Sequence, residues 1–256
     1  MHPSSTDPTG DSTAESPRIV GAIPARFGST RLPGKVLLPI AGRPMIEHVY
    51  RRASQAEGLA EVIVLTDDER VAQTVAGFGG RVQMTPETCH SGTDRIAHAA
   101  ADWTASAVIN IQGDEPLIEP AAISQLAAHL AAHPGHPMAT LAAPANEDDR
   151  DNPNVVKVVV DANERALYFS RAPIPHYRDD TSAASSWRHI GIYGYQRTTL
   201  LELAALPPTA LEKAESLEQL RALENGIPIQ VLAVESAWPG VDTMADLEAV
   251  ERLLAR

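Results

Sequence analysis

The sequence predicts an α/β protein built on a mostly parallel, twisted β-sheet with helices on its faces. Three apolar runs of strand length, at residues 19–23, 61–66 and 107–111, alternate with segments whose apolar residues recur at helical spacing. Strands and helices that alternate in this way form parallel sheets, because each helix returns the chain to the same end of the sheet. Polar residues follow each run, and the carboxyl ends of parallel strands are where open sheets bind ligands.

Composition narrows the class of protein further. The chain has 256 residues, which is enough for one large α/β domain, and a net charge of -12, which disfavours broad affinity for nucleic acid. No apolar run is long enough to cross a bilayer and no leader opens the chain, so a cytoplasmic protein with no membrane partner is expected. The single Cys89 excludes an intramolecular disulfide. Residues 1–17 are rich in Ser, Thr, Pro, Asp and Gly and are expected to form a disordered tail, which leaves 18–256 as a single domain.

The loop after the first apolar run carries an unusual concentration of positive charge. The run ends at Pro24, and Arg26, Arg31 and Lys35 follow among small residues. Backbone N–H groups and fixed cations on one loop suit a polyphosphate. Two common phosphate motifs are excluded, because Val36 stands where a Walker A motif needs Ser or Thr, and because no GxGxxG follows the strand. The alternative is an ordinary solvated basic loop.

The next elements continue the alternation of helix and strand. Apolar spacing predicts a helix that begins at Pro44 and runs to Ala53, and a second helix through 71–76 after the strand at 61–66. A short strand at 81–84 precedes a helix through 96–101. Ser91, Gly92 and Thr93 come just before that helix, where helix capping explains them as well as ligand binding does.

Two carboxylates follow the strand at 107–111. Gln112, Gly113, Asp114 and Glu115 stand at its carboxyl end, beside the expected position of the Arg26 loop. Adjacent carboxylates are often solvated turn residues. Magnesium, however, takes oxygen ligands and keeps most of its waters, so one or two carboxylates at such a place suffice to bind it.

The second half of the chain offers polar groups on strands. A helix is expected over 120–132, strands over 154–160 and 166–169, and another strand over 188–195. His189, Tyr193 and Tyr195 lie at alternate positions and hence on one face of that last strand. They could be half-buried strand residues, but Arg171, His189 and Tyr193 also supply the donors that would hold a polyhydroxylated acid.

A helix is expected over 214–224, with Leu217, Leu220 and Leu223 facing inward and Glu218 and Gln219 off that apolar line. A strand at 229–234 and a helix from Met244 complete the chain. Thr243 and Asp246 can cap that helix, so Asp242 is explained equally well as a neighbouring turn residue.

Ten segments together resemble the 3-deoxy-manno-octulosonate cytidylyltransferases, or CMP-Kdo synthetases, and the likeness covers the chain from about Arg18 to its end. They are PARFGSTRLPGK at 24–35, AGRPMIEHV at 41–49, TDDERV at 66–71, HSGTDR at 90–95, NIQGDEP at 110–116, NPNVVKVV at 152–159, YFSRAPIP at 168–175, RHIGIYGY at 188–195, LEQLR at 217–221 and GVDT at 240–243.

The resemblance implies a Rossmann-like nucleotidyltransferase fold with an insert at about 165–200 for sugar binding and homodimer contacts. It implies that Mg²⁺ is held by Asp114 and Asp242, and that Arg26, Lys35, Asp114 and Asp242 are catalytic. The residues implied to bind CTP are Pro24, Ala25, Arg26, Arg31, Lys35, Asp67, Ser91, Gly92 and Thr93, and those implied to bind the sugar are Gln112, Arg171, His189, Tyr193, Glu218 and Gln219.

The implied reaction joins CTP and 3-deoxy-D-manno-octulosonate (Kdo) to give CMP-Kdo and diphosphate, by attack of the anomeric hydroxyl on the α-phosphate. Such activation serves the synthesis of lipopolysaccharide, among other products. Two alternatives stay open. One is activation of a different acid, such as a nonulosonic acid or a phosphonate. The other is a CTP-binding regulatory protein without catalysis, against which the presence of both Asp114 and Asp242 argues.

Overall fold

The computed structural model describes residues 17–28, 32–178 and 186–255. Arg31 and the predicted tail, apart from Pro17, lie outside the described residues. The strands are β1 (Ile19–Pro24), β2 (Pro39–Ile40), β3 (Arg43–Pro44), β4 (Glu61–Thr66), β5 (Val82–Met84), β6 (Ala107–Asn110), β7 (Met138–Pro144), β8 (Lys157–Val160), β9 (Ala166–Ser170), β10 (Trp187–Gln196) and β11 (Ile229–Ala233). The helices are η1 (Lys35–Leu37, a 3-10 turn), α1 (Met45–Ala53), α2 (Glu69–Gly77), α3 (Gly92–Ala100), α4 (Pro120–Ala132), α5 (Glu147–Arg150), α6 (Arg197–Ala205), α7 (Ala210–Glu215), α8 (Gln219–Glu224) and α9 (Met244–Leu254).

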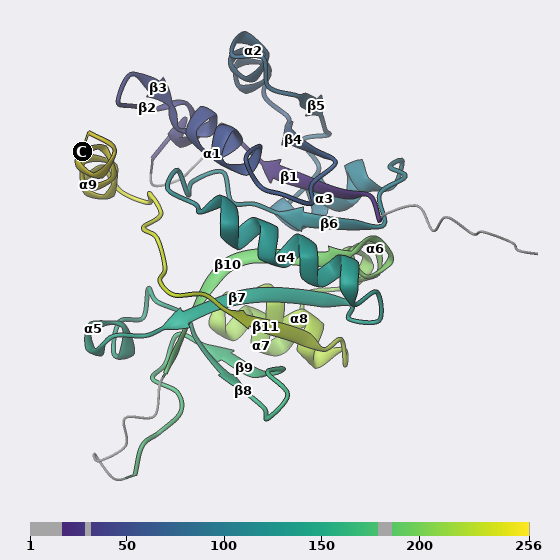
Figure 1. Ribbon diagram of the computed structural model, residues 1–256, viewed down its shortest axis with the longest axis vertical. Coiled ribbons are helices and arrows are strands. Elements are labelled where there is room, and N and C mark those ends of the chain that lie inside the picture. The colour runs from purple at the N-terminus through teal and green to yellow at the C-terminus, as the bar shows by residue number, and fades with distance from the viewer. Residues whose placement is uncertain (1–16, 29–31, 179–185, 256) are drawn as a thin grey trace, which may run out of the picture.

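One mixed sheet organises the molecule (Figure 1). Its strand order is β11-β7-β10-β6-β1-β4-β5, and the pair β8-β9 joins through β10. Neighbours along this order are parallel except at β10, which is antiparallel to both β6 and β7. The α/β class and the mostly parallel sheet predicted from the sequence are confirmed.

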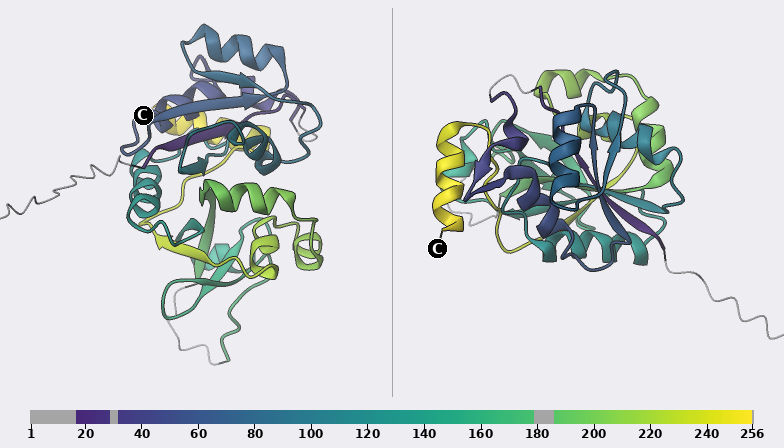
Figure 2. Two further views of the ribbon diagram at one scale, coloured as in Figure 1. Left: turned by 90° about the vertical axis from the view of Figure 1, so that its right-hand side faces the viewer. Right: turned by 90° about the horizontal axis from the view of Figure 1, so that it is seen from above.

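Helices cover both faces of the sheet, as Figure 2 shows. Side chains of β1 alternate between the two faces, so Ile19 and Ile23 pack with α1, α2 and α4, while Val20 and Ala22 pack with α3, α6 and α8. This alternation is the period of a strand buried on both sides, which explains the continuous apolar run in the sequence.

The order in which strands are added to the sheet reverses at β1. After β1 the chain builds β4 and β5 on one side, and it then returns to place β6 on the other side of β1. Strand order therefore switches between β1 and β6, and the loops after these two strands border a crevice of the kind in which open α/β sheets bind ligands.

The C-terminal segment crosses the molecule. After β11 the chain runs past the carboxyl ends of the central strands to α9, which lies beside β2 and β3 (Figure 1). There Val241, Leu247 and Val250 pack with Ile40 and Met45 in a small separate core. This packing anchors the loop that carries Asp242 at the central strand ends.

Several elements differ from those predicted. The strand expected over 154–160 begins at Lys157, the helix expected over 96–101 begins at Gly92, and β7, α5 and α6 were not expected. The single helix expected over 214–224 is wrong: α7 and α8 are separate, and Ser216 between them is in the left-handed conformation with φ of 52°. Glu215 explains the break, because its carboxylate accepts hydrogen bonds from the Ser170 hydroxyl (2.6 Å) and the Arg171 N–H (3.0 Å), which ties the end of α7 to β9. The helix predicted to begin at Pro44 begins at Met45, with Pro44 as its N-cap. Among the described residues, no helix has the length and apolar character needed to span a bilayer.

Candidate active site

A cavity of about 370 Å³ opens at the carboxyl ends of β1 and β6, beside the N-terminus of α3. Eight of the predicted site residues line it: Pro24, Ala25, Arg26, Lys35, Ser91, Gly92, Gln112 and Asp114. The predicted site did not include the other residues that line the cavity, which are Val36, Cys89, His90, Arg95 and Gly113. The cavity therefore lies where the strand order switches, as the polar residues after each strand predicted.

Lys35 joins the two carboxylates that were predicted to bind metal. Its ammonium donates to Asp114 Oδ2 at 2.7 Å and to Asp242 Oδ1 at 3.0 Å, although these residues lie 79 and 207 positions away in the chain. Burial alone would lower the pKa of Lys35, but the two carboxylates outweigh it and hold that pKa above its ordinary value of 10.5. Asp114 and Asp242 thus face one point at the edge of the cavity.

Gly34 sets the position of Lys35. Its φ of 69° lies in the left-handed region, and a Cβ there would come within 3.0 Å of the Phe27 ring. Its N–H donates to the Phe27 carbonyl at 2.9 Å, which closes the loop between β1 and η1. Glycine is therefore required at the turn that delivers the lysine.

The loops that carry Asp114 and Asp242 are joined to each other. The Val241 N–H donates to the Asp114 carbonyl at 2.9 Å, and the Trp238 indole N–H donates to Glu115 Oε2 at 2.8 Å. Burial raises the pKa of Glu115 to about 7, and the hydrogen bond from Trp238 opposes that rise. Glu115 therefore serves to dock the C-terminal segment against the end of β6.

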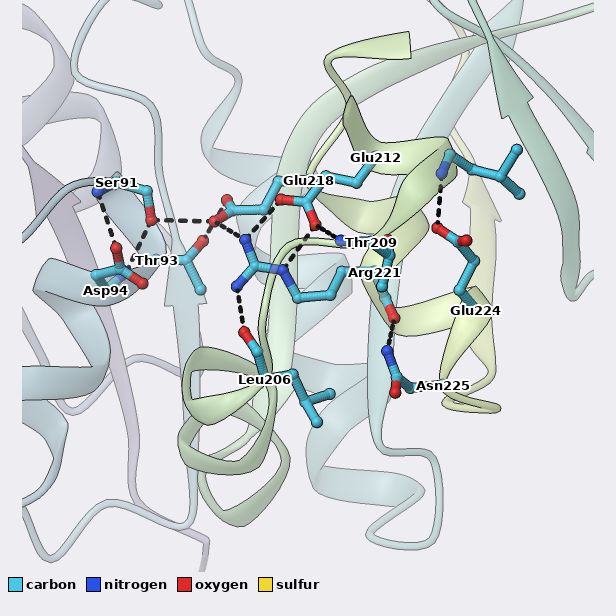
Figure 3. A network of polar contacts seen from close by, with 11 residues as sticks. Ser91, Thr93, Asp94, Leu206, Thr209, Glu212, Glu218, Arg221, Glu224 and Asn225 are labelled. Atoms are coloured by element: carbon cyan, nitrogen blue, oxygen red, sulfur yellow. Dashed lines mark hydrogen bonds and ion pairs between the residues drawn. The ribbon is translucent and has the colours of Figure 1, made fainter. Parts of the chain in front are cut away.

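The residues before α3 cap that helix and also contact a distant carboxylate. Ser91 is the N-cap, and with Asp94 it forms a reciprocal capping box. The Ser91 hydroxyl also donates to Glu218 Oε1 at 3.0 Å, and the Thr93 hydroxyl donates to Glu218 Oε2 at 2.7 Å. Figure 3 shows Glu218 between these hydroxyls and Arg221. Ser91 therefore caps α3 and also binds Glu218 across the site.

Arg221 of α8 binds Glu212 of α7 and so fixes the arrangement of these two helices at the break between them. Its guanidinium donates to both carboxylate oxygens of Glu212, at 2.9 and 2.5 Å, and to the Leu206 carbonyl at 3.2 Å, and it lies 3.8 Å from Glu218 (Figure 3). Gln219 is buried, not solvent-facing, with 5% of its surface exposed. Its Nε2 has no hydrogen-bond partner among the described residues, which leaves a buried donor unsatisfied next to Glu218 in the chain.

Asp67 pairs with a buried arginine. Its carboxylate accepts a hydrogen bond from Arg95 Nη2 at 2.6 Å, and Arg95, only 3% exposed, reaches the cavity wall. A buried arginine needs a carboxylate partner, and that requirement is the signal in the HSGTDR segment that would have identified Arg95. Burial raises the pKa of the neighbouring Cys89, which keeps the thiol protonated.

The remaining predicted sugar residues lie on β10 and directly after β9. The His189 and Tyr193 rings lie 5.4 Å apart, and Phe169 of β9 packs edge-on against His189 at 4.9 Å. Arg171 follows β9, and its Nε donates to the Glu215 carbonyl at 2.9 Å while Nη1 donates to the Pro153 carbonyl at 3.1 Å. The expected common face of His189, Tyr193 and Tyr195 is confirmed, since the Tyr193 and Tyr195 rings lie 6.1 Å apart.

The hydrogen bonds of Thr140 decide the tautomer of His189. The Thr140 hydroxyl must donate to the Ile192 carbonyl at 2.7 Å, because a carbonyl can only accept. His189 Nε2, 3.0 Å from that hydroxyl, must then be the donor. Burial lowers the pKa of His189 to about 3, so the ring is neutral and Nδ1 is an acceptor.

Comparison with known proteins defines the class to which this site belongs. A family model described as cytidylyltransferase matches residues 20–231. The 3-deoxy-manno-octulosonate cytidylyltransferase of Geobacter sulfurreducens is 52% identical over 243 residues, which cover 91% of this chain and 97% of that protein. The enzyme of the same name from Myxococcus xanthus is 49% identical and covers 94% of this chain and 98% of its own length.

Solved structures agree. The structure of CMP:2-keto-3-deoxy-manno-octonic acid synthetase in complex with CTP is 47% identical, with a TM-score of 0.89 over 93% of this chain and 98% of that one. A cytidylyltransferase from Leptospira borgpetersenii, at 16% identity, 93% coverage of this chain and 87% of its own, and a TM-score of 0.64, shares the fold. The chain is a nucleotidyltransferase of the cytidylyltransferase class. Within that class it belongs to the 3-deoxy-manno-octulosonate cytidylyltransferase family.

Proposed function

We propose that the protein transfers the cytidylyl group of CTP to Kdo, giving CMP-Kdo and diphosphate. The observation that carries this proposal is the meeting of Lys35, Asp114 and Asp242 at the edge of a cavity lined by Arg26, in a chain about half identical to enzymes of that name. In this reaction the anomeric oxygen forms a new bond to the α-phosphorus. The bond from that phosphorus to the β-phosphate oxygen breaks, and diphosphate leaves.

The cavity has the charges that the nucleotide requires. Arg26 and Lys35 would bind the triphosphate and stabilise charge that develops on its oxygens. Ser91 and Gly92, at the N-terminus of α3, would approach the base, and Pro24 and Ala25 form the wall after β1. Arg31, outside the described residues, would add a third cation.

Magnesium fits the donor set at this edge. Asp114 and Asp242 provide carboxylate oxygens around one point, the ligand type that magnesium prefers, and the Lys35 ammonium shows that a cation is stable there. Asp114 and Asp242 would hold the ion. When bound, magnesium would neutralise triphosphate charge and lower the pKa of the attacking hydroxyl.

The predicted sugar residues on β10 and directly after β9 belong to the proposed sugar site. Arg171 would pair with the sugar carboxylate, Gln219 would use its unpaired amide, and the Nδ1 atom of His189 would accept a hydrogen bond from a sugar hydroxyl. Glu218 contacts the Ser91 and Thr93 hydroxyls at the N-terminus of α3, and Gln112 lines the nucleotide cavity; both would also contact the sugar, as would Tyr193. We place the reaction in the cytoplasm, where its donor CTP is made, and expect the working enzyme to be a homodimer.

The test is release of diphosphate from CTP in the presence of magnesium. Kdo is compared with N-acetylneuraminic acid and with a reaction that lacks an acceptor. We expect release with Kdo alone, and mass spectrometry should identify CMP-Kdo. Release with N-acetylneuraminic acid but not with Kdo would contradict the proposed acceptor, and no release with any acceptor from a protein that binds CTP would contradict the sugar site altogether.

A further inference from the structure

Lys157 on β8 is a buried cation that the proposed reaction does not use. Its side chain is fully buried, and its ammonium donates to three main-chain carbonyls: Asn152 at 3.0 Å, Val155 at 2.7 Å and Arg171 at 2.6 Å. An ammonium has three donors and no acceptor, so these three bonds satisfy it completely. A neutral amine would direct a lone pair at one of the carbonyls, so this arrangement requires the charged form.

Burial and a neighbouring cation both oppose the positive charge of Lys157. Burial lowers the pKa of Lys157, and the Arg171 guanidinium acts in the same direction, whereas Asp151, Glu215 and Asp149 raise it. None of these carboxylates accepts a hydrogen bond from the ammonium; its contacts are all to main chain. Burying a lysine ammonium costs free energy of folding, which its hydrogen bonds offset only in part, so its retention here calls for an explanation.

The carbonyls that Lys157 holds belong to the two segments that fix Arg171. One is the carbonyl of Arg171 itself. The other two, of Asn152 and Val155, lie on either side of the pair Pro153 and Asn154, and the Pro153 carbonyl accepts a hydrogen bond from Arg171 Nη1 at 3.1 Å. With Nε bound to the Glu215 carbonyl, the guanidinium retains Nη2 and one N–H of Nη1, which form the edge that can grip a carboxylate with two parallel bonds.

The same turn also sets the position of His189. The His189 main-chain N–H donates to the Val156 carbonyl at 2.9 Å, immediately after Val155. Lys157 therefore lies at the junction of the turn at 152–156, the end of β9 and the start of β10. These three segments carry or contact both Arg171 and His189.

We propose that Lys157 is a positioning residue, which orients the Arg171 guanidinium for the carboxylate of the acidic sugar. This inference rests on the proposed function, because it takes Arg171 to be the residue that binds the sugar. Lys157 acts through main-chain carbonyls and does not itself touch the substrate.

The test is the variant Lys157→Met, which keeps the length of the side chain and removes all three donors. We expect the KM for Kdo to rise about tenfold or more, while kcat and the KM for CTP change less than about twofold, because binding of the sugar is weakened equally in the ground state and in the transition state. In an Arg171→Ala background, Lys157→Met should cause no further rise in the KM for Kdo, since the two residues act on one interaction.

Arg197→Met is the matched control. Arg197 also donates to main-chain carbonyls, those of Ala100 at 2.7 Å and Ala101 at 2.6 Å, at the end of α3. Both variants should lower the melting temperature, but only Lys157→Met should raise the KM for Kdo. Lys157→Gln, which retains two N–H donors, should give an intermediate KM.

The outcomes separate this inference from the proposed function. If Arg171→Ala raises the KM for Kdo and Lys157→Met does not, the positioning role is wrong and the sugar site stands. If Arg171→Ala also leaves that KM unchanged, the sugar site itself is wrong. If neither variant of Lys157 folds, the residue serves the fold alone and the positioning role is discarded.

Discussion

Lys35 holds together two carboxylates that would otherwise repel each other. Asp114 and Asp242 approach the same atom, at 2.7 and 3.0 Å, and a bound metal ion would compete with the ammonium for their oxygens. This competition implies that Lys35 has two effects. It would stabilise the empty site, and it would turn toward phosphate charge when CTP and magnesium are bound.

Lys35→Met should separate these two effects. We expect turnover to fall by about 10²-fold or more, as for loss of one stabilising charge in a transition state. Binding of Mn²⁺ without CTP, measured by electron paramagnetic resonance, should be unchanged or tighter because the competing cation is gone. Weaker Mn²⁺ binding in the variant would show that Lys35 supports the metal site and does not compete with it.

The low pKa of His189 predicts that the free energy of unfolding falls over a defined acid range of pH. Its pKa is about 3 in the folded protein and near 6.5 when unfolded, so the unfolded chain binds the extra proton first as the pH falls. Stability from the neutral ring is complete above pH 6.5 and is lost as the pH falls from 6.5 toward 3.

The variant His189→Gln lacks this titration. The difference in free energy of unfolding between the wild type and the variant should shrink by about 3 kcal/mol between pH 7 and pH 4. Urea denaturation at each pH provides the measurement. A difference that stays constant over this range would mean that His189 has the same pKa in the folded and unfolded protein, so that burial does not lower it.

At the scale of elements, the central feature is the joint between the loop after β6 and the segment before α9. The Trp238 indole and the Val241 N–H make the contacts that bring Asp242 to Asp114. Because α9 packs in its own small core, this joint decides where Asp242 lies relative to the sheet.

Trp238→Phe keeps most of the packing and removes the donor to Glu115. We expect the magnesium concentration at half-maximal activity to rise several-fold, because the loop that carries Asp242 loses a hydrogen bond of about 1–3 kcal/mol. The KM for Kdo should change little. Trp103→Phe is the control. It removes an indole donor on the loop after α3, which binds Gln83 of β5 at 3.2 Å, and it should leave the magnesium dependence unaltered.

The sequence predicted most elements on which the site depends, because their signals are local. Strands β1, β4 and β6 are continuous apolar runs, and the caps at Ser91 and Thr243 follow short-range rules. The meeting of Asp114 with Asp242 was also predicted, once the resemblance to the family identified the second carboxylate, but Asp242 lies on the segment before α9 and not at a strand end.

What the sequence did not predict depends on tertiary contacts. The break at Ser216 arises because Glu215 binds β9, and the leucines at 217, 220 and 223 give the same spacing with or without it. Strand β7 was not predicted, since its alanine-rich sequence has low strand propensity and gains its place from its neighbours β10 and β11. The pairing of Asp67 with the buried Arg95 likewise needs the folded sheet.

At the scale of the molecule, we expect assembly of two chains. Leu167 on β9 is 61% exposed, which is unusual for a large apolar side chain, and it lies in the region implied to form homodimer contacts. Light scattering should give a mass of about twice the 27.4 kDa of one chain. Leu167→Glu should shift the protein toward monomer, whereas Met84→Glu, on β5 and 49% exposed, should not. A wild-type monomer, or equal effects of both changes, would contradict this interface.

We propose that the fold joins a nucleotide site and a sugar site. The cavity lies at the switch between β1 and β6, three of the proposed sugar residues (Arg171, His189 and Tyr193) lie after β9 or on β10, and Glu218 contacts Ser91 and Thr93 at the N-terminus of α3. Transfer between two bound substrates needs one centre that both can reach, and Asp114 and Asp242 are the proposed centre.

The most direct measurement is therefore Mn²⁺ binding in the presence of CTP, by electron paramagnetic resonance, in the wild type and in Asp114→Asn and Asp242→Asn. We expect each variant to bind Mn²⁺ at least about tenfold more weakly and to lose turnover, with an unchanged circular dichroism spectrum. Wild-type affinity in both variants would contradict the assignment of these two carboxylates to the metal site and, with it, the proposed centre of the reaction.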